Sequence, residues 1–170
     1  MNTVLEKNEG YLDITKDYKC LSYYEVRDTK YFKDSNGNKY YVDDRNVILD
    51  YSKKEKEVAI WLSNTFGGKI YMLPKVNKPD GIKTADYLWN NEYWDLKDIK
   101  NGQSSRTVDN TIKRTKNQTN NIILDVSNNN LSNNEIIRQV KKIYITNGRE
   151  WIDKIIVKRE NKVIIILKRK

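Results

Sequence analysis

The chain has 170 residues, of which 32% are charged and 38% hydrophobic, with a mean hydropathy of −0.85 and a formal net charge of +9. This length suits one main domain, and 4 Trp and 12 Tyr supply rings for a core, which argues against a disordered chain. The absence of histidine excludes Ser-His-Asp triads and His-ligated zinc, and the single cysteine, Cys20, excludes an internal disulfide or a thiolate metal cage. Any metal site must therefore use oxygen ligands, which suit Mg²⁺ or Mn²⁺ best, with Zn²⁺ as an alternative.

The positive charge is spread unevenly. Residues 1–50 hold 8 Lys and Arg against 10 Asp and Glu, whereas residues 51–170 hold 24 against 13. A strongly basic segment favours binding to phosphate backbones, although it also suits solubility or an acidic protein partner. No charged-then-apolar leader and no apolar run of about 18 residues stands out. We therefore expect a soluble domain that works in a reducing compartment and has no membrane partner.

Residues 1–50 are predicted to form a small β extension or a linker, separate from a main domain at residues 51–170. Aromatic, strand-like runs flank Asn36-Gly37 in "YFKDSNGNKYYV", a pattern typical of a β-hairpin. The run "RNVILDY" after it is compatible with a further strand.

The main domain is predicted to begin with a helix over residues 52–66. Ser52 is the candidate N-cap with Glu55 three residues later, and Gly67-Gly68 is the stop signal. The elements expected after it are a strand over 69–76, a hairpin over 84–98, a polar helix over 104–119, a strand over 121–126, a helix over 133–143 and strands over 153–160 and 162–169. This order predicts an α/β sandwich with a central mixed sheet.

The stretch "TADYLWNNEYWDLKDIK" is predicted to be a hairpin that turns at Asn90-Asn91, because Asn tolerates the positive φ of a two-residue turn. In this register Asp86 lies opposite Asp95. Alternation then assigns Ala85, Tyr87, Trp89, Trp94 and Leu96 to a core face, and Asp86, Leu88, Tyr93, Asp95 and Lys97 to the other.

Two opposed carboxylates destabilise a sheet unless their charges are neutralised. Lys97 can neutralise only one of Asp86 and Asp95. A divalent cation bound by both carboxylates would neutralise the rest and would place the lysine beside an attacking water. The alternative is a solvated Asp-Asp-Lys face whose ion pairs contribute about 0 to 1 kcal/mol each.

The polar helix "SSRTVDNTIKRTKNQT" supplies candidate contacts to phosphate and sugar. These nucleic-acid-binding candidates are Arg106, Thr107, Lys113, Arg114, Lys116 and Gln118. An ordinary solvated helix face explains each of them equally well. Among the aromatic residues, Tyr93 is the one expected to stack on a base, because it shares the acidic face.

At this point the residues resemble a known family. "ADYLWNNEYWDLK" is similar to the PD-(D/E)XK nuclease superfamily pattern, with Ala85 in place of the usual proline and with Asp86, Asp95 and Lys97 as the acid, acid and lysine. The segments "KEVAIWLSNTFGG", "LPKV", "GIKTADYL", "WDLK" and "KNQTNNIILDV" resemble the C-terminal tRNA-cleaving domains of contact-dependent growth-inhibition toxins and related domains on phage head proteins. The resemblance covers roughly residues 50–170 and implies a three-layer sandwich with a restriction-endonuclease-like core.

The resemblance also implies roles for individual residues. Glu57 on the first helix is the expected third acidic ligand, with Glu55 as the fallback. The implied activity is metal-dependent phosphodiester hydrolysis, with the ion held by Glu57, Asp86, Asp95 and the main-chain carbonyl of Leu96, and with Lys97 orienting and helping to deprotonate the attacking water.

The substrate expectation, transfer RNA, rests on the resemblance alone. A DNA endonuclease of restriction or repair type is one alternative, and a catalytically silent basic module, either nucleic-acid-binding or part of a phage, is another. A toxin domain of this kind implies a larger secreted delivery protein or a phage head protein, a cytoplasmic site of action in a target cell, and a small immunity protein.

Overall fold

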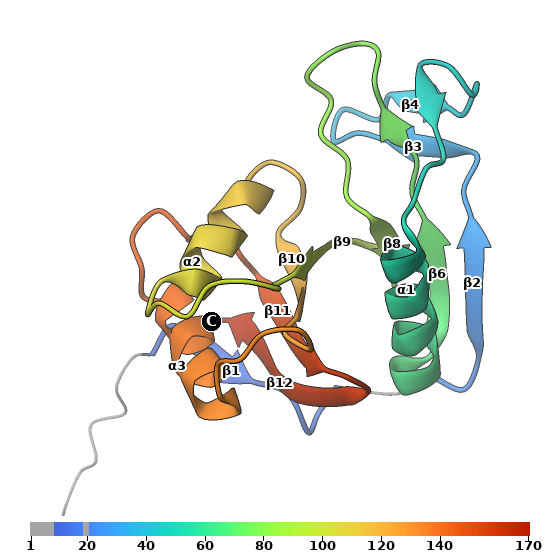
Figure 1. Cartoon of the computed structure of the whole chain (residues 1–170). Coiled ribbons are helices and arrows are strands. Elements are labelled where there is room, and N and C mark those ends of the chain that lie inside the picture. Colours follow the sequence, from blue (N-terminus) through green and yellow to red (C-terminus); the bar gives the residue numbers. More distant parts are fainter. Residues whose placement is uncertain (1–8, 19–20) are drawn as a thin grey trace, which may run out of the picture.

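The computed structural model describes residues 9–18 and 21–170, and Cys20 lies outside them. An eight-stranded mixed sheet runs through the molecule (Figure 1). Its strands in spatial order are β1 (Tyr11–Asp13), β12 (Lys162–Arg169), β11 (Lys154–Arg159), β10 (Asn121–Asp125), β9 (Glu92–Asp98), β8 (Tyr87–Trp89), β6 (Gly68–Met72) and β2 (Tyr24–Asp28). Strands β9, β10 and β11 are parallel, as are β2 and β6, whereas the other neighbours are antiparallel. The predicted α/β class with a mixed sheet is confirmed.

Helices cover both faces of this sheet. They are α1 (Lys53–Phe66), α2 (Thr107–Ile112), which continues into the 3-10 turn η1 (Lys113–Thr115), and α3 (Asn133–Ile143). On β10, Ile123 belongs to the buried cluster under α1, whereas Ile122 and Leu124 belong to the cluster under α2 and α3. Strand residues alternate between faces, so α1 lies on one side of the sheet and the α2–α3 pair on the other. Within the described part of the chain, no helix has the length and apolar character needed to cross a bilayer.

The first helix has the boundaries that its local sequence predicts. The Ser52 side chain accepts from the Glu55 N–H, and the Glu55 carboxylate accepts from the Ser52 N–H, which completes the predicted capping box. At the other end, Gly67 has a φ of 75°, and a Cβ there would lie 2.3 Å from the carbonyl oxygen of Leu21. Glycine is therefore required at this position for both conformation and space.

The N-terminal 50 residues differ from the predicted separate extension. Strand β1 pairs with β12 at one edge of the main sheet, and β2 pairs in parallel with β6 at the other edge. These strands therefore belong to the same sheet as the main domain. Their alternation carries no information about a partner far along the chain, which is why the sequence pattern did not reveal the pairing.

The part of this segment that extends beyond the main sheet is a small hairpin. Strands β3 (Tyr31–Lys33) and β4 (Lys39–Tyr41) flank the predicted Asn36-Gly37 turn and lie beyond the ends of β2 and β6 (Figure 1). The predicted strand at 69–76 divides in two, since β7 (Lys75–Val76) leaves the main sheet to pair with β5 (Val47–Ile48). Leu73, Val76 and Phe32 contribute to a third buried cluster between these pieces.

Candidate active site

The acidic hairpin has the predicted turn and register. Tyr87 pairs with Trp94 and Trp89 with Glu92, and Asn90 and Asn91 have φ values of 52° and 62°. Two successive positive φ values are typical of the type I′ turn that joins antiparallel strands through two residues. The register confirms the sequence interpretation and brings Asp86 beside Asp95.

Asp86 lies just before β8, where the backbone departs from regular alternation. Its N–H donates to the Trp94 carbonyl at 3.1 Å, and its Oδ2 accepts from the Leu96 N–H at 2.7 Å. Ala85 packs in the third cluster, on the same side as Leu88, rather than on the core face with Tyr87. The assignment of Ala85 to that face was wrong, because regular alternation does not extend through Asp86.

The two carboxyl groups repel each other in a buried setting. Asp95 is 1% exposed. Burial raises the pKa of Asp86, and the Asp95 charge and a side-chain hydrogen bond with Asp95 raise it further, to about 8, although the Leu96 N–H acts in the opposite direction. Lys97 Nζ lies 2.8 Å from Asp95 Oδ2. Lys97 therefore supplies one positive charge beside two carboxyl groups, and it cannot neutralise both of them.

The donor set suits a hard divalent cation. Asp95 Oδ2 is buried and accepts no hydrogen bond of good geometry, despite the nearby Lys97 ammonium. Within residues 9–18 and 21–170, no three acidic or cysteine side chains are grouped closely enough to hold an ion. Two carboxylates with water and substrate phosphate as the remaining ligands form a common Mg²⁺ environment. The residues present fit an ion with two protein carboxylates.

The third acidic ligand expected from the resemblance, Glu57, is not brought to this pair. Its side chain is 57% exposed and lies 3.7 Å from Lys53 on the outer side of α1. Glu55 is the helix carboxylate whose charge contributes to the raised Asp86 pKa, although it also caps Ser52. Leu96 contacts Asp86 through its N–H, and its predicted role as a carbonyl ligand stays a prediction.

The start of α1 is fixed against the hairpin by a partly buried hydrogen bond. The Tyr87 hydroxyl donates to the Glu55 carbonyl at 2.6 Å, so the first turn of the helix is held next to the strand that follows Asp86. Sequence reasoning assigned Tyr87 to the core and did not identify this polar contact.

A second buried cluster of charged residues was not predicted from the sequence. Asp125, at the end of β10, is fully buried, 2.8 Å from Lys54 Nζ and 3.0 Å from Lys158 Nζ. Burial alone would raise its pKa, but hydrogen bonds from Lys54, Ser127 and Lys158 outweigh that effect and lower the pKa to about 2. This cluster ties α1 to the centre of the sheet.

The basic helix is shorter than predicted, and its candidate residues divide into two groups. Four cations are exposed to solvent: Arg106, Lys113, Arg114 and Lys116. Thr107 is only 6% exposed and lies at the first turn of α2, so its side chain has little surface for the predicted nucleic-acid contact. Gln118 is half-buried, and its Oε1 is buried without a hydrogen-bond partner.

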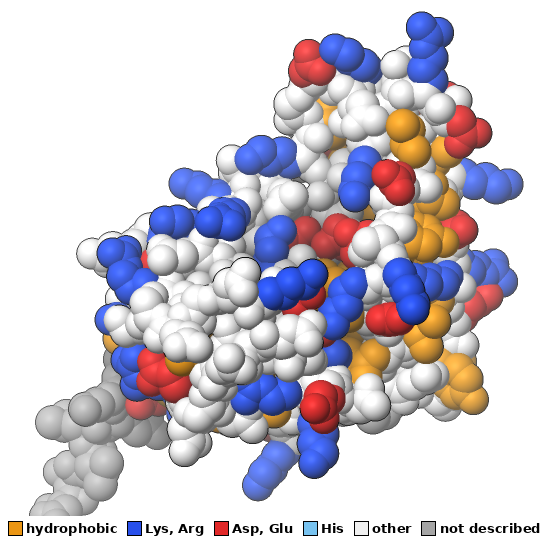
Figure 2. Space-filling view, in the orientation of Figure 1, with side chains coloured by type: hydrophobic (Ala, Val, Ile, Leu, Met, Phe, Trp, Pro, Cys, Tyr) orange, Lys and Arg blue, Asp and Glu red, His pale blue; other side chains and the backbone are white. Residues whose placement is uncertain are grey.

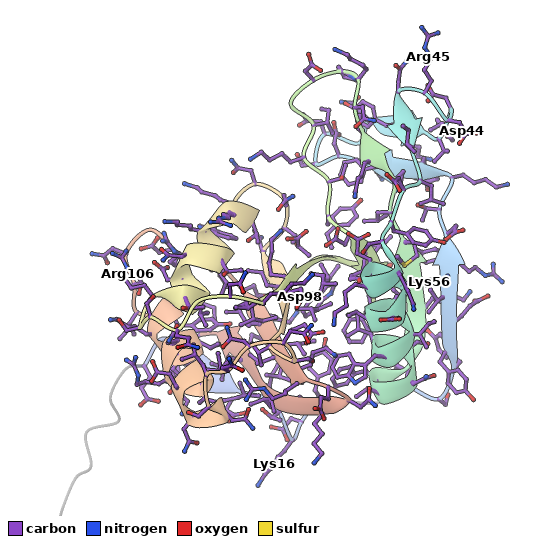
Figure 3. The ribbon with its side chains drawn as sticks, in the orientation of Figure 1. Lys16, Asp44, Arg45, Lys56, Asp98 and Arg106 are labelled. Atoms are coloured by element: carbon purple, nitrogen blue, oxygen red, sulfur yellow. The ribbon has the colours of Figure 1, made fainter. Side chains whose placement is uncertain are left out.

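Acidic side chains lie between the two halves of the molecule. Figure 2 shows Asp and Glu side chains between the α1 half and the α2–α3 half of the visible face, with Lys and Arg side chains around them. In Figure 3, Asp98 lies between these two halves, and Arg106 points outward from the far side of α2. An acidic centre with a basic surround suits a metal ion that meets a phosphate backbone.

Residues 83–163 match a family model, that of the contact-dependent growth inhibition CdiA C-terminal domain. The matched segment contains Asp86, Asp95, Lys97 and the basic helix, and it supports the resemblance to contact-dependent growth-inhibition toxins. Comparisons with curated proteins and with solved structures gave no match. The PD-(D/E)XK assignment stays a prediction.

Proposed function

We propose that this chain is a metal-dependent nuclease domain of the contact-dependent growth-inhibition type, with transfer RNA as its substrate. The observation that carries the proposal is the buried Asp86–Asp95 pair with Lys97 alongside, within the segment that matches the family model. Domains of that family are toxin domains and are usually nucleases. A restriction-endonuclease-like sandwich is the fold that accords with this activity.

In the proposed site, Asp86 and Asp95 hold Mg²⁺ or Mn²⁺, with the Leu96 carbonyl as a further ligand. The ion would supply positive charge for the phosphate and lower the pKa of a water molecule. Asp86, whose pKa is raised by burial and by Asp95, would release its proton when a cation is bound, because the positive charge would offset the repulsion between the two carboxylates. Lys97, 26% exposed, lies between Asp95 and solvent, where it orients the attacking water and a phosphate oxygen.

The proposed substrate contacts continue onto the basic helix. The exposed side chains of Arg106, Lys113, Arg114 and Lys116 supply phosphate contacts that carry no sequence preference. Transfer RNA as the substrate rests on the resemblance, because DNA and RNA present the same scissile group.

The activity is tested by incubating purified protein with total tRNA and with plasmid DNA, in Mg²⁺, Mn²⁺, Zn²⁺ or EDTA. RNA fragments that require a metal support the proposal, nicked plasmid supports a DNA endonuclease, and no cutting in any metal contradicts both. Asp95→Asn should abolish cleavage while retaining the fold. Asp80→Asn is the matched control, since that carboxylate is 82% exposed and pairs only with Lys78 among the contacts of the structure.

The family match also supports proposals about partners. Domains of this kind belong to a larger delivery protein that carries them into target cells, and they typically pair with an immunity protein. We therefore propose that this chain acts in the target-cell cytoplasm and is neutralised by a small immunity protein. Expression of the chain alone in cells should arrest growth in a manner that depends on Asp95. Growth equal to that of the Asp95→Asn strain would contradict the toxin assignment.

A further inference from the structure

One half of the sheet is covered only in part on the side opposite α1, where Leu88 and Tyr93 pack against the third buried cluster. Helices α2 and α3 cover this side of the sheet over β10, β11 and β12, where the buried cluster contains Ile122, Ile155 and Leu167. Across β2, β6, β8 and β9 the same side instead carries a row of residues in direct register. The row runs through Arg27, Tyr71, Leu88 and Tyr93, and it is named here the tyrosine face.

The register places these four side chains on one surface. Arg27 pairs with Tyr71, Tyr71 with Leu88, and Leu88 with Tyr93. The neighbours of Tyr71 on β6, Ile70 and Met72, are buried under α1, so Tyr71 itself points to the opposite side. Tyr71, Leu88 and Tyr93 are half-buried and Arg27 is exposed, which leaves ring surface open to a ligand.

Two adjoining hollows lie on the tyrosine face. The larger, of about 450 Å³, is lined by all four residues of the row, and the smaller, of about 340 Å³, shares Tyr71 and Leu88 with it. Each volume is large enough for a nucleobase, since small-molecule sites begin at about 300 Å³. Their polar rims include Asn90 and Asn91, the turn residues of the acidic hairpin.

The rim of this face is basic although the N-terminal segment is acidic as a whole. Lys30 and Lys33 line the larger hollow with Arg27, and Lys69 lines the smaller one. Asp28 is the acidic residue that lines the larger hollow, and its carboxylate accepts from the Tyr51 hydroxyl. Arg27 is itself paired with Glu25. Aromatic rings bordered by lysines match the phosphates and bases of a nucleic-acid strand.

The tyrosine face leads directly to the candidate active site. Tyr93 lies two residues before Asp95 on β9, and side chains two apart on a strand share a face. The Tyr93 hydroxyl donates to the Lys33 carbonyl at 2.7 Å, and its ring lies 5.6 Å from that of Phe32. These contacts hold the ring in place, so little conformational freedom is lost when a base stacks on it.

We propose that the tyrosine face binds unpaired bases of the nucleic-acid substrate beside the scissile phosphate. The proposal rests on the proposed nuclease function and deepens it: the enzyme takes a single-stranded segment, such as a loop or an end, rather than a continuous duplex. In a duplex the faces of the bases are already stacked and are not accessible to tyrosine rings. Residues 24–33, which lie outside the segment that matches the family model, then contribute to substrate choice.

The test measures binding in EDTA, where no metal-dependent cleavage occurs, by fluorescence anisotropy of short labelled oligonucleotides. The probes are a single-stranded RNA, the same sequence as single-stranded DNA, a duplex, and single strands with one abasic site at successive positions. The variants are Tyr71→Leu and Tyr93→Leu, with Tyr71→Phe and Tyr93→Phe to preserve the rings. Tyr24→Leu is the matched control, because Tyr24 is 69% exposed on β2 and faces the opposite side of the sheet from Arg27.

The proposal predicts that each Leu variant weakens single-strand binding by about tenfold, whereas the Phe variants and Tyr24→Leu bind normally. An abasic site at the stacked position should weaken wild-type binding but have little further effect in the corresponding Leu variant. Equal RNA and DNA affinity would assign sugar selection to another part of the molecule while retaining the stacking. A binding affinity that is unchanged by the Leu substitutions, or that is higher for the duplex than for the single strands, overturns the proposal.

The same measurements separate this proposal from the nuclease assignment. If stacking-dependent binding is found but no metal supports cleavage, the tyrosine face stands and the nuclease function fails. If Asp95-dependent cleavage is found but binding is unaffected by both Leu variants, the nuclease function stands and the tyrosine face fails. Loss of binding to a co-purified protein, with unchanged oligonucleotide affinity, assigns the face to a protein partner and also overturns the proposal.

Discussion

Two buried aspartate sites lie in the same sheet and have opposite charge balance. Asp86 shares its surroundings with a second acid, and its pKa rises to about 8, whereas Asp125 contacts two lysines and its pKa falls to about 2. Burial raises the pKa of both, but the Asp95 carboxyl group adds to that effect at Asp86, whereas hydrogen bonds from Lys54, Ser127 and Lys158 outweigh it at Asp125. A carboxylate with surplus cations stabilises the fold, and one that lacks a cation is suited to bind one. The balance of charge around each aspartate therefore distinguishes a structural ion cluster from a candidate catalytic site, independently of any sequence motif.

The largest loss of stability is expected at Asp125. Asp125→Asn leaves the ammonium groups of Lys54 and Lys158 without their counter-charge, and Lys158 is only 5% exposed. Breaking a buried ion pair by removing one partner typically costs about 3 kcal/mol or more. The free energy of unfolding in urea at pH 7 should fall by that amount. A loss below about 1 kcal/mol would show that this cluster stabilises the fold no more than ordinary surface ion pairs do.

In metal-free protein, we expect a substitution of Asp86 to increase the free energy of unfolding rather than reduce it. The unfolded chain loses the Asp86 proton near its ordinary pKa of 3.8, but the folded chain keeps it to about 8, so wild-type stability falls as the pH rises between these values. Asp86→Asn removes this penalty. At about 1.4 kcal/mol per pH unit, the span from 3.8 to about 8 sets an upper bound of about 5 kcal/mol on the unfolding free energy that the variant gains over wild type at pH 8.

This gain should shrink as the pH falls and vanish below about pH 3, where wild-type Asp86 is protonated in both states. Urea denaturation in EDTA at several pH values gives the profile. Asp80→Asn, at an exposed carboxylate, supplies the control and should show no pH-dependent gain. A loss of stability in Asp86→Asn at pH 8 would contradict the charge imbalance described for the pair.

A smaller effect on stability is expected at the hydrogen bond between Tyr87 and the first turn of α1. Tyr87→Phe removes the hydrogen bond to the Glu55 carbonyl, so unfolding free energy should fall by about 1 kcal/mol. The first turn of α1 would then be held mainly by the Lys54–Asp125 contact. Cleavage should decline modestly through kcat, because the acids beside the helix are less well positioned. An unchanged kcat with the expected stability loss would show that the hydrogen bond serves the fold alone.

The features that were predictable from sequence are those with local causes. The capping box of Ser52 and Glu55 set the start of α1, and the positive φ values of Asn90 and Asn91 set the hairpin register that brings Asp86 to Asp95. Each depends on residues within a few positions of one another. The helix over 133–143 was likewise predicted, and the structure shows Ser132 as its N-cap.

The features that were missed depend on contacts between distant parts of the chain. Strand β2 joins β6 by backbone pairing that leaves no mark on its side-chain pattern, and Lys54 on α1 forms an ion pair with Asp125 on β10. The burial of Thr107 follows from where the short α2 begins, which the polar sequence around it did not reveal. The position of Glu57 depends on which side of α1 faces the hairpin, and the resemblance alone did not determine this.

Thermal unfolding in the presence of Mn²⁺ or Mg²⁺ tests the central claim most directly, since a ligand that binds the folded state raises the unfolding temperature. The Asp86–Asp95 pair should bind the ion, so the unfolding temperature of wild type should rise with metal concentration and return to its starting value in EDTA. The same rise should persist in Asp125→Asn and disappear in both Asp86→Asn and Asp95→Asn. An equal rise in those last two variants, or no rise in wild type, would contradict the assignment of the pair as a metal site.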